Sequence, residues 1–168
     1  QVLMQALHEL RTQIISPMTD ELKTDKEEDA DELFQQHIEA QCKRLRILGF
    51  TGTPIIRGNL NAMDKSLLPS LQTVCTEILN NIAKHGKPGA FAFILSVGPD
   101  AVRIFASNLY NAAINSAPEN HYGTALIQDF AQQHNGTMTI NSENEEWSLS
   151  LTIPLAHQVK LMFSPTEK

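Results

Sequence analysis

Basic residues are few in this 168-residue chain, which holds 13 lysines and arginines against 19 aspartates and glutamates, a formal net charge of −6 at pH 7. Sequence-independent binding to DNA or RNA needs a basic face, so this balance argues against a nucleic-acid partner. It does not exclude a bound nucleotide, because a few backbone N–H groups and one lysine can hold a polyphosphate inside an acidic protein.

Cysteine is also scarce. Cys42 and Cys75 are far apart and show neither a CxxC nor a Cys/His spacing. We therefore expect two reduced, buried thiols and no structural zinc site, which fits a cytosolic compartment. No apolar run approaches the roughly 20 residues that cross a bilayer, and no signal peptide is visible. Because the chain begins at Gln1, we expect a fragment of a longer protein, with any membrane segment upstream.

Apolar periodicity divides the chain into a helical segment (1–48), a mixed domain (49–156) and a tail (157–168). Steps of three and four residues between 3 and 22 predict one amphipathic helix, which Pro17 bends. A second helix is expected to present one apolar face, made of Leu33, Ile38, Cys42, Leu45 and Leu48.

The mixed domain combines both periodicities. Alternating apolar residues and turn signals predict strands over 51–60, 90–97, 101–107, 137–142 and 147–155. Helical spacing predicts helices over 67–84 and 124–134, whereas 109–122 lacks periodicity and is typical of a loop. Hairpins mixed with helices predict an α+β fold, with helices packed on one face of a largely antiparallel sheet.

The segment TEILNNIAKHG (76–86) holds the most informative polar residues. Glu77, Asn81, Lys84 and His85 lie at i, i+4, i+7 and i+8 of a predicted helix, and therefore on one face. A carboxylate and an amide oxygen suit Mg²⁺, and a lysine suits phosphate. The alternative is a solvated helix face on which this set is incidental.

The pattern Glu-x3-Asn-x2-Lys-His resembles the N-box of histidine kinases and of the wider GHKL superfamily of ATPases, which shares the Bergerat fold. The resemblance implies that Asn81 binds Mg²⁺, that Lys84 and His85 approach the phosphates, and that Glu77 is the catalytic residue near the reacting phosphoryl group. Asn80 falls off the matching position.

Family members continue with two paired strands and an Asp-x-Gly-x-Gly box, whose Asp accepts a hydrogen bond from the adenine amino group. In this chain Asn108 falls in register with that Asp, and Tyr110 stands where the glycine is expected. An Asn oxygen still accepts a hydrogen bond but carries no charge. The box is therefore degenerate, and we expect weaker adenine binding.

Downstream, Gly123, Thr124, Ala125 and Leu126 resemble the Gly-x-Gly-Leu box that opens a helix after the ATP lid. Such a box sets backbone N–H groups against phosphates, and Ala125 keeps its N–H. Taken alone, the segment also fits an ordinary helix start after a glycine. The family's closing hairpin matches 135–155, and the absence of a GxxxxGK[ST] loop excludes P-loop chemistry.

One motif is deceptive. The segment 8–12, HELRT, resembles a phosphoacceptor box, but Gln13 stands where proline is expected and the N-box follows too soon. The end of a second dimerisation helix is the better match, so we expect the phosphoacceptor histidine outside this chain rather than at His8.

The resemblance implies a Bergerat-type two-layer α/β sandwich preceded by a helical segment, acting as the ATP-binding catalytic domain of a bacterial two-component sensor histidine kinase. It implies Mg-ATP as cofactor and transfer of the γ-phosphoryl group to a histidine. The implied partners are the protein's own dimerisation and phosphoacceptor domain, a second copy in a full-length homodimer, and a response regulator. The implied location is the cytoplasmic part of a membrane-anchored sensor. There are two alternatives. One is a degenerate, non-catalytic Bergerat domain that acts through a protein partner, and the other is an anti-sigma-type serine kinase. An upstream pair of dimerisation helices argues against the serine kinase.

Overall fold

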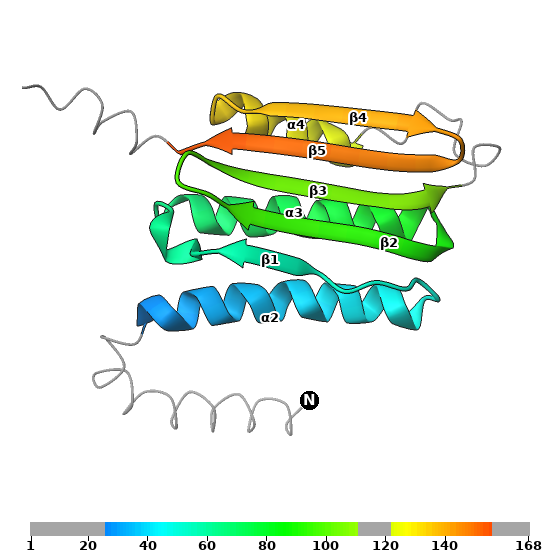
Figure 1. The fold of residues 1–168 in the computed structure, drawn as a ribbon, viewed down its shortest axis with the longest axis horizontal. Helices are drawn as coiled ribbons and strands as arrows, with labels where there is room; N and C mark the ends of the chain where they lie inside the picture. Colours follow the sequence, from blue (N-terminus) through cyan, green and yellow to red (C-terminus); the bar gives the residue numbers. More distant parts are fainter. Residues whose placement is uncertain (1–25, 111–121, 156–168) are drawn as a thin grey trace, which may run out of the picture.

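The structure is a computed structural model that describes residues 26–110 and 122–155 (Figure 1). The helix predicted over 2–22, most of the predicted loop and the tail lie outside these residues, and so does His8. The described part contains these elements in chain order: α2 (Lys26–Ile47), β1 (Ile55–Gly58), the 3-10 helix η2 (Leu60–Ala62), α3 (Leu67–His85), β2 (Gly86–Val97), β3 (Ala101–Tyr110), α4 (Tyr122–Gln133), β4 (Thr137–Glu143) and β5 (Glu146–Pro154).

The strands form one mixed sheet in the order β1-β2-β3-β5-β4. β1 pairs with β2 in parallel, and the other neighbours are antiparallel. α3 and α4 lie behind the sheet in Figure 1, while α2 runs alongside β1. Among the described helices, none is long and apolar enough to cross a membrane.

The sheet buries one face against the helices. Along β3, Val102, Ile104 and Ala106 are buried, whereas Arg103 and Phe105 are exposed. This alternation follows from the pleat, which points successive side chains to opposite faces. The inward side chains of the strands and the apolar faces of α2, α3 and α4 form one hydrophobic core.

α2 belongs to that core. Its buried face consists of Phe34, Ile38, Cys42 and Leu45. The predicted face was wrong at both ends, because Leu33 is 62% exposed and Leu48 is 52% exposed. Phe34 takes the inward position instead, four residues before Ile38. α2, which falls in the predicted helical segment (1–48), therefore shares its hydrophobic core with the sheet.

Two strands are longer than predicted. β2 begins at Gly86 rather than at residue 90, because the chain continues from α3 into the sheet through an irregularity between Gly86 and Phe91. β3 continues through Tyr110, which lies in the predicted loop. Tyr110 pairs with Gly86 and donates its backbone N–H to the carbonyl of Glu145 at 2.9 Å.

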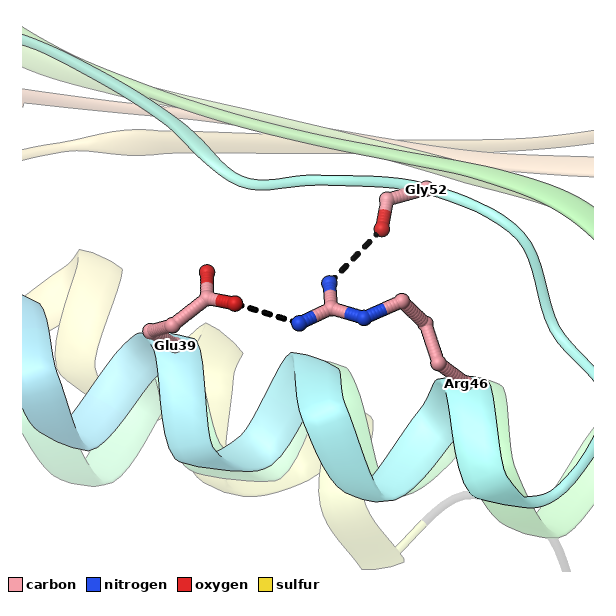
Figure 2. Close-up of polar contacts among 3 residues, drawn as sticks. All are labelled: Glu39, Arg46 and Gly52. Carbon is pink, nitrogen blue, oxygen red and sulfur yellow. Dashed lines mark hydrogen bonds and ion pairs between the residues drawn. The ribbon is translucent and has the colours of Figure 1, made fainter.

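The last turns of α2 are fastened to the segment that leads into β1. Figure 2 shows Arg46 between two partners: its Nη1 donates to the carbonyl of Gly52 at 2.9 Å, and its Nη2 forms an ion pair with Glu39. This contact is part-buried and joins the helix to the backbone beside the sheet. It fixes the end of α2 relative to the start of β1.

Candidate functional site

α3 separates an apolar face from a polar one, as predicted. The positions buried against the sheet include Ile78, Leu79 and Ile82. Glu77 and Asn81 are half-buried on a different side of the helix, and Lys84 is exposed. His85 is the last residue of α3 and is half-buried. The polar residues of the predicted site therefore lie along one side of a helix whose other side is anchored in the core.

The end of α3 meets the end of β3 at Gly86. The backbone N–H of Gly86 caps α3 by donating to the carbonyl of Ile82. A Cβ placed on Gly86 would lie 2.4 Å from that carbonyl oxygen and 2.5 Å from Nδ2 of Asn108. Only a residue without a side chain fits there. This close approach brings Asn108 against the final turn of the polar helix.

Asn108 is a buried polar side chain, 5% exposed, on the helix-facing side of β3. Its Nδ2 donates to the backbone carbonyl of Leu109 at 2.8 Å. With the amide nitrogen engaged in this way, the side-chain oxygen is the atom that can accept a hydrogen bond from a ligand.

α4 begins at the same side of the molecule at which α3 and β3 end (Figure 1). Its first turn contains Gly123 and Thr124. The next two residues, Ala125 and Leu126, are exposed and line a hollow of about 450 Å³ whose other wall is α3, through Ser70, Thr73 and Val74. By helical spacing, Glu77 and Asn81 continue the stripe of Ser70 and Thr73. The predicted site residues of α3 and α4 therefore lie on the two helices that line this hollow.

The donor set fits a nucleotide-borne metal better than a metal held by protein alone. Across the described ranges, no three His, Cys, Asp or Glu side chains come together as a metal site. Mg²⁺ commonly uses one or two protein oxygens together with substrate phosphates and water. The amide of Asn81, half-buried on α3, would offer one such oxygen, and the first turn of α4 would offer N–H groups of the kind that bind phosphate.

Two contacts between α2 and α3 were not predicted from the sequence. Arg44 of α2 donates to Asn80, and His37 of α2 contacts Thr76. These partners are 36 and 39 residues apart in the chain. No local pattern signals such pairs, because they arise only when two helices pack side by side.

Solved structures with the same architecture are known. The nucleotide-free catalytic domain of the histidine kinase ThkA superposes with a TM-score of 0.55 at 12% identity, covering 74% of this chain and 93% of that one. The histidine kinase AdeS of Acinetobacter baumannii superposes with a TM-score of 0.57 at 12% identity, covering 92% of this chain and 85% of that one. The chain has the histidine kinase catalytic-domain fold. The α+β fold class expected from the sequence, with helices on one face of a mixed sheet, is thereby confirmed.

A third structure shows the histidine kinase catalytic-domain fold within a larger protein. Full-length ShkA, solved in complex with AMPPNP, superposes with a TM-score of 0.58 at 13% identity, and the match covers 74% of this chain but 29% of ShkA. The sequence itself matches no protein-family model and no curated protein. The likeness to these three structures is therefore one of fold.

Proposed function

We propose that this chain is the ATP-binding catalytic domain of a two-component sensor histidine kinase, which passes the γ-phosphoryl group of Mg-ATP to a histidine outside this chain. The observation that carries the proposal is the close approach at Gly86, which sets the buried amide of Asn108 against the end of the polar helix α3. The histidine kinase catalytic-domain fold supports it, and ShkA, which shares that fold over part of its length, was solved in complex with AMPPNP.

Each proposed role follows from the chemistry of the side chain. The oxygen of Asn81 binds Mg²⁺ together with phosphate oxygens. Lys84 and His85 approach the phosphates, as do the N–H groups of Gly123 and Thr124 at the start of α4. Glu77 lies near the reacting phosphoryl group. Bound Mg-ATP would supply the phosphoryl group, and the protein contributes positioning and charge neutralisation.

The side-chain oxygen of Asn108 is proposed to accept a hydrogen bond from the adenine amino group, in place of the carboxylate that the family uses. A hydrogen bond to a neutral acceptor is weaker than one to a charged acceptor by about 1–2 kcal/mol. We therefore expect adenine nucleotides to bind roughly 5–30-fold more weakly than they would to an intact box. The proposal is a functional but low-affinity nucleotide site.

The partners follow from the same proposal. The phosphoacceptor histidine belongs to a dimerisation domain of the same protein, which acts as a homodimer, and a response regulator receives the phosphoryl group. The full protein is proposed to be a membrane-anchored sensor with this domain on the cytoplasmic side, and the membrane segment lies outside this chain.

Titration calorimetry tests nucleotide binding directly. We expect AMPPNP to bind the wild-type chain with Mg²⁺, and Asn81→Ala to lose the Mg²⁺-dependent part of the affinity while its thermal unfolding stays cooperative. Asn141→Ala is the matched control, because Asn141 is an exposed asparagine of β4. Wild-type binding that is equally strong in EDTA, or an Asn81→Ala variant that fails to fold, would contradict the role of Asn81.

A second candidate is a non-catalytic domain of the same fold that acts through a protein partner. The observation in its favour is Tyr110, which occupies the expected glycine position and is held in β3 by its pairing with Gly86. Absence of heat with the wild-type chain at millimolar AMPPNP and Mg²⁺ would favour this candidate over the kinase.

A further inference from the structure

α2 contacts α3 at the two residues that directly precede the predicted site residues. Nη2 of Arg44 donates to Oδ1 of Asn80 at 2.6 Å, and Asn80 precedes Asn81. The second contact joins His37 to Thr76, and Thr76 directly precedes Glu77. It is a hydrogen bond between Nε2 of His37 and the hydroxyl oxygen of Thr76 at 2.8 Å.

The direction of the second hydrogen bond is fixed by its neighbour. The hydroxyl of Thr76 donates its proton to the carbonyl of Gln72 at 2.8 Å. Its oxygen is therefore left to accept from Nε2 of His37, which carries the proton in this tautomer. Both side chains of α2 thus act as donors toward α3.

The two contacts form a stripe beside the proposed site. Thr76 and Asn80 are four residues apart, so they lie one above the other on the side of α3 that faces α2. Glu77 and Asn81 form the adjacent stripe, one residue further round the helix. A shift or rotation of α2 against α3 therefore changes the orientation of both stripes together.

α2 is itself held at its end. Arg46 donates to the backbone carbonyl of Gly52 and forms an ion pair with the carboxylate of Glu39, as Figure 2 shows. Two residues earlier, Arg44 reaches α3. The last turns of α2 therefore connect the backbone that enters β1 with the polar helix of the site.

We propose that Arg44 and His37 are positioning residues that set the polar face of α3 for Mg²⁺ and nucleotide, an inference that rests on the function proposed above. Arg44 acts in two ways. It fixes the turn that carries Asn81, and it occupies the oxygen of Asn80, so that only one of two adjacent amides is offered to a cation. A cation that approached the oxygen of Asn80 would be repelled by the positive charge of the guanidinium already bound to it.

Removal of Arg44 tests the proposal in the nucleotide-free protein first. We expect Arg44→Ala to move the side-chain amide NMR signals of both Asn80 and Asn81. Lys43→Ala is the matched control: Lys43 is the exposed neighbour on the same helix, and its loss changes the net charge equally. The control should leave both signals in place.

Nucleotide affinity provides the second measurement. We expect Arg44→Ala to weaken AMPPNP binding about 3–10-fold in the presence of Mg²⁺ and less than twofold in EDTA, a difference that a purely structural role would not produce. Arg44→Lys keeps a donor and should recover most of the affinity. In a double-mutant cycle, Arg44→Ala and Asn80→Ala should not be additive, because the first acts through the second. His37→Ala should weaken Mg²⁺-dependent binding in the same direction, and His37→Gln, which keeps a donor, should weaken it less.

The outcomes separate the two proposals. If the wild-type chain binds AMPPNP with Mg²⁺, but Arg44→Ala matches Lys43→Ala in affinity and in the signals of Asn81, the positioning role is overturned and the proposed function stands. A lower unfolding temperature in Arg44→Ala with unchanged affinity has the same meaning. If the wild-type chain binds no nucleotide, the proposed function fails and this inference fails with it.

Discussion

Asn108→Asp is the substitution that would restore the family's charged acceptor, and the structure predicts that it destabilises the fold. The amide of Asn108 is 5% exposed and donates to the carbonyl of Leu109 at 2.8 Å. An ionised carboxylate cannot donate, so this bond is lost at a cost of about 1 kcal/mol. Burying the charge beside a carbonyl oxygen adds about 1–3 kcal/mol. The expected loss in the free energy of unfolding at pH 7 is therefore about 2–4 kcal/mol.

The loss should depend on pH in a defined direction. Burial and the neighbouring carbonyl raise the pKa of the introduced carboxyl above its unfolded value of about 3.9. A group with a raised folded-state pKa favours folding below the unfolded pKa, and this contribution is lost as the pH rises through the folded pKa. Asn108→Asp should therefore approach the stability of the wild type near pH 4 and fall behind it toward pH 7.

Thermal unfolding followed by circular dichroism between pH 4 and pH 8 measures both effects. At pH 7 we expect the midpoint to fall by roughly 5–15 °C. Asn141→Asp, the same change at an exposed position of β4, should stay within about 0.5 kcal/mol of the wild type. Asn108→Ala should lose stability without the pH dependence. An Asn108→Asp variant as stable as the wild type at pH 7, or one whose deficit does not shrink in acid, would refute the assignment of Asn108 as a buried donor.

Three further outcomes follow from the structure. Gly86→Ala should cost about 1–3 kcal/mol in denaturant unfolding, because its Cβ would lie 2.4 Å from a backbone oxygen of α3; Gly98→Ala, with no atom closer than 3.5 Å, should cost less. The thiols should resist Ellman's reagent at pH 8 until the chain unfolds, because burial raises the pKa of Cys42 to about 11 and raises that of Cys75 further; rapid reaction of the native protein would contradict their burial. His8 should remain unphosphorylated when the chain is incubated with Mg-ATP, and stoichiometric phosphohistidine that disappears in His8→Gln would overturn that prediction.

The sequence predicted the parts of the fold in which local periodicity and tertiary burial agree. The helix over 67–84 was predicted within one residue of α3, because its apolar positions recur every three or four residues and all face one core. The strands on either side of the 98–100 turn were recognised from their alternation. Elements of this kind satisfy the local pattern and the global packing at once.

The remainder depended on long-range contacts. Leu33 and Phe34 are both apolar, and only the placement of α2 beside the sheet decides that Phe34 is buried and Leu33 exposed. Lys87, Pro88 and Gly89 favour a loop locally, yet the chain there enters β2 through an irregular pairing with β3. The strand order, which sets β3 between β2 and β5, is likewise not encoded in any single segment.

The candidate site shows the same division. Its residues were found through a family pattern: Glu77, Asn81 and Lys84 lie on the predicted helix, whereas Asn108 and Gly123 lie on elements that extend past their predicted bounds. Their mutual arrangement was not predictable from spacing. Neither the contact between Gly86 and Asn108 nor the hydrogen bond from Arg44 to Asn80 has a signature in the sequence, because each joins residues more than 20 positions apart on different elements.

The departures from the family's adenine box at Asn108 and Tyr110 share one backbone conformation. β3 continues as a strand through Tyr110, whose N–H bonds the carbonyl of Glu145 at 2.9 Å. An extended residue needs no positive φ, so glycine has no conformational advantage at this position and would add flexibility. The same conformation brings the carbonyl of Leu109 within 2.8 Å of the amide nitrogen of Asn108, a bond that a carboxylate cannot make. An amide at 108 and a tyrosine at 110 therefore belong together. Reverting position 108 alone sets a carboxylate against the carbonyl of Leu109, and reverting position 110 alone adds flexibility to an extended strand.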